Sequence, residues 1–69
     1  MTIGKLIKHD NNTDVALLVH RIVYIPEKRG YKIKGSWINI VGEHYPCGIT
    51  EEVFVNNNDI KNWKVYEGK

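Results

Sequence analysis

The sequence has a single cysteine, two prolines and no long apolar run near its amino terminus. Because Cys47 is alone, an internal disulfide is excluded, and one thiol is typical of a reducing cytoplasm rather than of a secreted protein. The first ten residues, MTIGKLIKHD, carry charges at Lys5, Lys8 and Asp10. They therefore match neither a signal peptide nor a membrane span. We expect a cytoplasmic protein that has no contact with a membrane.

The excess of positive charge is also small, with a formal net charge of +2 over 69 residues. A net charge this small does not by itself indicate a nucleic-acid-binding protein. A chain of this length forms one domain, residues 1–69, and folding buries only about 60% of the surface that the unfolded chain exposes. Such a domain is marginally stable and gains from a closed barrel or from self-association.

No segment has the 3.6-residue apolar period of an amphipathic helix, whereas alternation and β-branched residues are frequent. The longest apolar run, VALLVHRIVYI at Val15–Ile25, is rich in β-branched residues and ends at Pro26, which favours a central, buried strand. The polar sequence NNNDI predicts one turn of 3₁₀-helix, capped by Asn58 or Asp59, before the last strand. The other strands are expected at residues 3–8, 31–41, 52–55 and 62–67.

The strand at residues 31–41 has a break in its alternation. Ile33 lies on one parity and Ile38 and Ile40 on the other, so a regular strand would place them on opposite faces. A glycine inside a strand often marks a bulge, and we therefore expect a bulge at Gly35. In the turn before this strand, Gly30 is expected to have a positive φ. The core is then expected to contain Ile7, Val19, Ile22, Ile33, Ile40, Val53, Val55 and Ile60.

The order of the expected elements is that of an SH3-like barrel: five short strands, with a hairpin in the middle and a 3₁₀ turn before the last strand. The segments YKIKGSWINIV and EEVFVNNNDIKNWKVY carry this resemblance, which extends from Gly4 to Glu67. In this pattern the chain resembles the very small SH3-like proteins of bacteriophages. The resemblance implies an all-β, five-stranded barrel, a place in the host cytoplasm and a host or viral protein as the partner. It supplies no functional residue, because the loop HDNNTD lacks the acidic, ALYDY-like sequence of peptide-binding SH3 domains.

Catalytic and metal-ligating patterns are sparse. His44 and Cys47 have the spacing of one zinc-ligand pair, but the sequence has no second pair to complete four ligands. An activated thiol at Cys47 needs an oriented base and an oxyanion site, and so small a barrel has little room for a cleft. Glu51 and Glu52 are adjacent, so on a strand they face opposite sides and do not form an acid–base pair. We therefore expect a binding protein with no enzyme activity, metal or cofactor.

Basic residues gather in the central hairpin, at Lys28, Arg29, Lys32 and Lys34. Cations beside aromatic rings are typical of a surface that binds nucleic acid or a nucleotide. Alternatively, these charged side chains only solvate and protect an exposed hairpin.

A second candidate surface consists of the aromatic residues Tyr24, Tyr31 and Trp37. With a bulge at Gly35, Trp37 faces outward and anchors an interface; the other possibility is that it closes an open end of the barrel. In both cases Trp37 lies outside the central core. These rings are therefore expected to contact a protein partner.

The sequence also predicts self-association. The strand Val15–Ile25 is apolar on both faces, whereas a solitary barrel needs only one apolar face. We expect a homodimer or higher oligomer built partly on this strand and on Trp37. The alternative is that the long loops, especially residues 42–49 with Tyr45 and Ile49, fold over the second face within a monomer.

Overall fold

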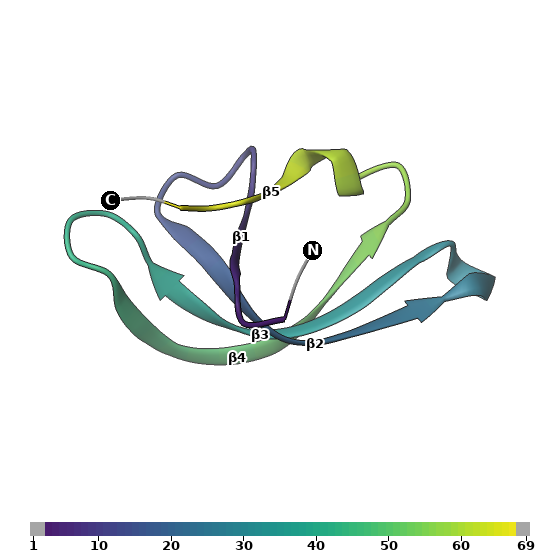
Figure 1. Ribbon diagram of the computed structural model, residues 1–69, viewed down its shortest axis with the longest axis horizontal. Coiled ribbons are helices and arrows are strands. Elements are labelled where there is room, and N and C mark those ends of the chain that lie inside the picture. Colours follow the sequence, from purple (N-terminus) through teal and green to yellow (C-terminus); the bar gives the residue numbers. More distant parts are fainter. Residues whose placement is uncertain (1–2, 68–69) are drawn as a thin grey trace.

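The apolar run VALLVHRIVYI forms the strand around which the sheet is built (Figure 1). In the computed structural model, which describes residues 3–67, this strand β2 (Val15–Ile25) pairs with strands on both sides. All pairs are antiparallel, and the order in the sheet is β4-β3-β2-β1-β5. The other elements are β1 (Leu6–His9), η1 (Pro26–Lys28), β3 (Gly30–Asn39), β4 (Tyr45–Asn56), η2 (Ile60–Asn62) and β5 (Trp63–Val65).

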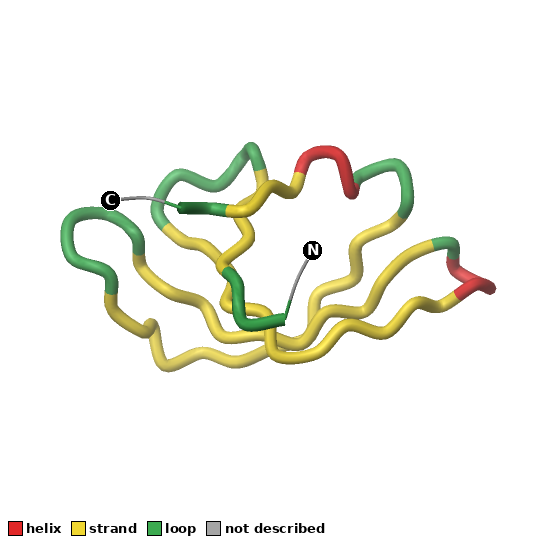
Figure 2. Tube along the Cα trace, viewed as in Figure 1, coloured by secondary structure: helices red, strands yellow, loops and turns green. Residues whose placement is uncertain are grey.

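The predicted all-β class and the predicted bounds of the central strand are confirmed. The predicted 3₁₀ turn is also present as η2, and Figure 2 shows it just before the last strand. Asp59 occupies the N-cap position, but its side chain does not form the capping hydrogen bond. Among residues 3–67, no helix has the length and apolar character needed to cross a membrane.

The fourth strand is much longer than expected, because most of residues 42–52 belong to β4 rather than to a loop. Pro46 is tolerated because β4 is at the edge of the sheet, where one side of the strand needs no backbone donor. Gly48 takes a positive φ of 78°. Tyr45 and Ile49 are each 54% exposed, so this segment does not cover the second face of β2 in the way that the monomer alternative requires.

The sheet is open, which corrects the expectation of a closed barrel. Within residues 3–67, β4 pairs only with β3 and β5 pairs only with β1, whereas closure needs a ladder between the two edges. Strand β5 has only three residues, and η2 occupies the path between the end of β4 and the start of β5. The long strands β2, β3 and β4 form a curved layer, and β1, β5 and η2 lie on its concave side (Figures 1 and 2).

A bulge interrupts β2 rather than β3. Val19 lies opposite Gly35 and Arg21 lies opposite Lys34, so His20 is an extra residue in β2 without a partner in β3. A bulge of this kind bends the strand and reverses the face on which the following side chains lie. The expected bulge at Gly35 is therefore wrong, because β3 stays regular along its pairing with β2.

Two glycines of β3 are required by close approach to a neighbouring strand. A Cβ atom at Gly35 would lie 2.5 Å from the Leu18 carbonyl oxygen and 2.7 Å from Cγ of Leu17. A Cβ atom at Gly30 would lie 2.5 Å from Cζ of Phe54. Gly30 does not have the expected positive φ; the preceding residue, Arg29, takes the left-handed conformation with a φ of 52°.

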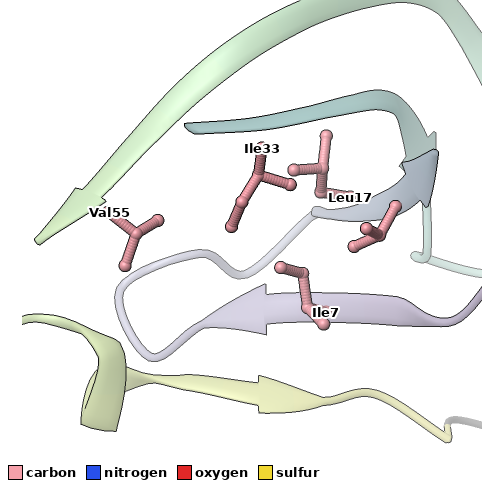
Figure 3. Packing of buried hydrophobic residues seen from close by; sticks show 5 residues of the cluster. Ile7, Leu17, Ile33 and Val55 are labelled. Carbon is pink, nitrogen blue, oxygen red and sulfur yellow. The ribbon is translucent and has the colours of Figure 1, made fainter. Parts of the chain in front are cut away.

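The hydrophobic core lies on the concave face of the curved layer. Its buried cluster draws one or two side chains from each of the four longer strands: Ile7, Leu17, Val19, Ile33 and Val55 (Figure 3). Of the residues predicted for the core, Ile22, Val53 and Ile60 pack against this cluster while partly exposed, and Ile40 is buried outside it. Leu17 and Ala16 are buried although neither was expected in the core.

We expect Gly35→Ala to lower the free energy of unfolding by about 3 kcal/mol, because the new methyl group meets a backbone oxygen that cannot turn away. Urea denaturation measures this loss. The control is Gly42→Ala, where no heavy atom lies within 4 Å of the Cβ position and the φ of 72° alone costs about 1 kcal/mol. Equal losses in the two variants would show that close packing at Gly35 has no special weight.

Candidate functional site

The convex face of β2, β3 and β4 contains a basic hollow. Beyond the bulge, Arg21 lies opposite Lys34 and Val23 lies opposite Lys32, and directly opposite residues share a face of the sheet. Since Ile33 is in the concave core, Lys32 and Lys34 on either side of it lie on the convex face. The hollow has a volume of about 280 Å³ and is lined by Arg21, Val23, Ile25, Lys32, Lys34 and Glu52.

The hollow contains three cations and one carboxylate. Lys32 Nζ is 3.9 Å from Glu52 Oε1, and both side chains are about half exposed, so this pair is weak. Within residues 3–67, neither Arg21 nor Lys34 forms an ion pair. The positive charge of the hollow is therefore largely available to an anionic group of a partner.

The structure brings only two of the four predicted cations into the hollow. Lys28 ends η1 and Arg29 follows it, so both lie at the tip of the hairpin and not among the residues that line the hollow. Arg21 was not expected at this site. In an unbroken strand it would share the parity of Val19 and face the core, and only the extra residue His20 moves it to the convex face.

The hairpin tyrosines lie on the face opposite the lysines. Tyr24 and Tyr31 are directly opposite each other, with ring centroids 4.9 Å apart, and Tyr31 packs against the concave core. The basic residues are therefore not flanked by the rings that the sequence suggested. The ring on the convex face is that of Phe54, which lies opposite Lys32 and is 46% exposed.

Trp37 also lies on the concave face, directly opposite Leu17, and packs against the core cluster while partly exposed. Its indole Nε1 donates a hydrogen bond to Glu51 Oε1 at 2.6 Å. The expectation that Trp37 faces outward is wrong, because β3 contains no bulge that would turn it. The role of Tyr24, Tyr31 and Trp37 in a protein interface stays a prediction.

A chain of polar side chains crosses three strands beside the bulge. His20 Nε2 is 2.7 Å from Ser36 Oγ, and Ser36 Oγ is 3.0 Å from Thr50 Oγ1. An imidazole beside a hydroxyl is the first half of an activated nucleophile, which also needs a group that orients the imidazole. Among residues 3–67, the hydroxyl of Ser36 is the hydrogen-bonding partner of the His20 ring. We interpret these hydrogen bonds as a link that holds the bulge of β2 to β3 and β4.

The most connected titratable cluster joins β1 to η2 and β5. Asp59 accepts hydrogen bonds from the Asn62 side chain at 2.8 Å and from Trp63 Nε1 at 3.2 Å, and its Oδ1 is 3.2 Å from His9 Nε2. The backbone N–H of Asn11 donates to His9 Nδ1, so neutral His9 carries its proton on Nε2 and donates it to Asp59. The hydrogen bonds from Asn62, His9 and Trp63 hold the pKa of Asp59 below its usual value.

The suggested zinc pair does not gain further ligands from the fold. His44 lies beside Tyr66, with ring centroids 5.8 Å apart, and Cys47 is half-buried at the start of β4. The part of the chain that the structure describes contains no group of three or more histidine, cysteine, aspartate or glutamate residues that can hold a metal ion.

Comparisons of the chain with models of protein families, with curated proteins and with solved structures found no match. The resemblance to small phage SH3-like proteins therefore stays a prediction. Inference about function rests on the surfaces of the molecule, and the basic hollow is the most distinctive of them.

The Asp59 cluster predicts a pH dependence of stability. Because the pKa of Asp59 is lowered in the folded protein, its contribution is present above the unfolded pKa of about 3.9 and is lost as the pH falls below that value. Asp59→Asn removes the contribution, and its amide group also meets the donors Asn62 and Trp63. We expect Asp59→Asn to have a lower melting temperature than the wild type at pH 7. The difference should become smaller below about pH 4, which is near the unfolded pKa.

Circular dichroism melts between these two pH values measure the effect. The control is Glu27→Gln, which removes one exposed carboxylate from η1 without removing a hydrogen bond of the Asp59 cluster. A constant difference in melting temperature between Asp59→Asn and the wild type across this range would contradict the assignment.

Proposed function

We propose that the protein has no enzyme activity and acts by binding a partner protein on the convex face of β2, β3 and β4. The observation that carries the proposal is the basic hollow, where Val23 and Ile25 provide apolar surface beside three cations. At about 280 Å³ the hollow is slightly smaller than typical sites that enclose a small molecule, which start near about 300 Å³. Its size and mixed chemistry suit one or two side chains of a macromolecular partner.

The chemistry of the hollow favours an acidic protein surface as the partner. Arginine is enriched in the centres of protein interfaces, and Arg21 can bind a carboxylate with two parallel hydrogen bonds. Glu52 in the same hollow repels a continuous run of phosphates but is compatible with a partner that places single carboxylates near Arg21 and Lys34. Phe54 extends the apolar part of this face.

The order of the elements supports an SH3-like arrangement of the open sheet. In this arrangement β1 pairs with both β2 and β5, and a 3₁₀ turn precedes β5. With the sequence pattern, this order supports a phage-type accessory role in the host cytoplasm, with a host or viral protein as the partner.

Binding of nucleic acid or a nucleotide is the second candidate. It is favoured by the basic residues of the central hairpin, where Arg21, Lys32 and Lys34 on the convex face are joined by Lys28 and Arg29 at the tip. The exposed ring of Phe54 lies on the same face as Lys32 and can stack on a base.

The two candidates predict different responses to charge reversal. Docking of a protein in the hollow requires Arg21 and Lys34, so the double variant Arg21→Glu/Lys34→Glu is expected to weaken capture of the partner from a bacterial lysate at least about tenfold. Capture should be unchanged by nuclease treatment. The control is Lys5→Glu/Lys61→Glu, which makes the same change of net charge at exposed sites away from the hollow. Equal loss of capture in both double variants would contradict docking in the hollow.

Fluorescence anisotropy with labelled oligonucleotides at two salt concentrations tests the second candidate. Release of counterions requires nucleic-acid affinity to fall steeply with salt, and Lys28→Glu/Arg29→Glu should weaken it as much as reversal of the hollow. The same tip variant should leave protein capture unchanged. Absence of binding at low salt removes the nucleic-acid candidate.

A further inference from the structure

Strand β4 leaves a long edge of the sheet without a partner. It has 12 residues, and within residues 3–67 its only neighbour in the sheet is β3. The opposite edge is β5, which has three residues. An unpaired edge presents backbone N–H and C=O groups that can pair with a strand of another chain, and natural proteins usually keep such edges short or interrupted.

Only the first half of this edge is interrupted. Pro46 lacks a backbone N–H, Gly48 has a φ of 78°, and the register with β3 shifts between Ser36 and Ile38. Residues 50–56 contain neither proline nor glycine and pair with β3 in one continuous register. The regular part of the edge is therefore residues 50–56.

The register shows which backbone groups of this segment point outward. The N–H of Asn57 donates to the Arg29 carbonyl, and the N–H of Ile40 donates to the Asp14 carbonyl across the other side of β3. Partners alternate along an antiparallel ladder, so both bonds place the odd-numbered residues of β4 toward β3 and the even-numbered residues outward. The C=O of Asn56 already accepts from Asp59, which leaves Glu52 and Phe54 at the centre of the free edge.

The length of the regular edge and its charges together favour one way of pairing two copies. Antiparallel pairing about a two-fold axis at Val53 spans residues 50–56 and places Glu52 opposite Phe54 of the partner subunit, while the Asn56 C=O stays bonded to Asp59. Glu52 of each chain then exchanges two backbone hydrogen bonds with Phe54 of the partner subunit. Pairing about Glu52 would instead place two carboxylates directly opposite each other, which is unfavourable.

Pairing about Val53 also extends the chemistry of the convex face. Within one chain Lys32 lies opposite Phe54 and Lys34 lies opposite Glu52. Across the axis, Glu52 would lie between Lys34 of its own chain and Phe54 of the partner subunit. Phe54, 46% exposed in the single chain, would be covered by this contact.

We propose that two copies of this chain pair antiparallel through residues 50–56 of β4, with the two-fold axis at Val53. This surface differs from the one that the apolar sequence of Val15–Ile25 suggested for self-association. Strand β2 is paired on both sides at residues 17–19, beyond which, within residues 3–67, it pairs with β3 alone, and Trp37 packs on the core. The regular edge of β4, residues 50–56, combines unpaired backbone on its outer side, an exposed ring and a complementary charge.

Hydrogen exchange and sedimentation equilibrium of the wild-type protein test the pairing. Across a series from about 10 µM to about 1 mM, the mass should rise from 8.0 kDa toward twice that value. Over the same series the amides of Glu52 and Phe54 should become protected, whereas those of Glu51 and Val53 should be protected throughout because they face β3. A mass of 8.0 kDa at every concentration, or protection that does not depend on concentration at Glu52 and Phe54, would overturn the proposal.

Two substitutions of the same exposed ring test the register. Phe54→Lys places a cation opposite Glu52 of the partner subunit, whereas Phe54→Glu places two carboxylates together. We expect the Phe54→Glu dimer to dissociate at least about tenfold more readily than the Phe54→Lys dimer. Inside one chain the preference is reversed, because residue 54 lies opposite Lys32 and a glutamate is the favourable partner there. A Phe54→Glu variant that is at least as stable as Phe54→Lys but more weakly associated therefore supports the pairing; equal or stronger association of Phe54→Glu overturns it.

Discussion

The extra residue in β2 is the constraint on which the rest of the structure depends. Up to Val19 the odd-numbered residues of this strand face the core, and beyond His20 the even-numbered residues do, so Ile22 continues the concave apolar surface and Arg21 turns to the other side. An unbroken strand would bury a guanidinium group against Ile33, which is costly without a partner. One inserted residue thus keeps the core apolar and places a cation beside Lys34. The hydrogen bonds of His20 and Ser36 hold the insertion in position.

Bending at this point requires β2 and β3 to approach closely, and Gly35 permits the approach because it has no Cβ atom. A single three-stranded layer buries little by itself, so its concave side needs a cover. The short strands β1 and β5 and the turn η2 provide this cover, and Asp59 fixes it by accepting hydrogen bonds from η2, β5 and β1. The polar cluster at Asp59 therefore has a structural role, and the same hydrogen bonds lower the pKa of Asp59.

The sequence predicted the all-β class, the bounds of β2, the turn η2 and most of the core, because apolar alternation and turn residues are local signals. It did not predict the position of the bulge. The parity break in β3 was read as a bulge at Gly35, yet β3 stays regular along β2 and the extra residue belongs to the facing strand. The bulge in β2 changes the parity of β2 alone, so Ile33 and Ile38 of the regular strand β3 lie on opposite faces. Because the bulge was expected in β3, Arg21 was not expected on the convex face and Trp37 was expected to face outward. The sequence also did not predict which side chains lie beside Lys32, because pairing with β4 and its register are not encoded locally.

In a domain this small, the proposed binding chemistry lies on the surfaces. The concave side holds a core of five buried side chains. The convex side and the edge of β4 need no further packing, and Glu52 belongs to both, since it lines the hollow and lies at the centre of the free edge. Pairing of two edges about Val53 would place two hollows on one continuous convex face. A partner with two acidic groups could then contact both hollows, and its affinity would rise through effective concentration without any new contact in either one. Self-association and partner binding would thereby be coupled through the geometry of one strand, and each would favour the other.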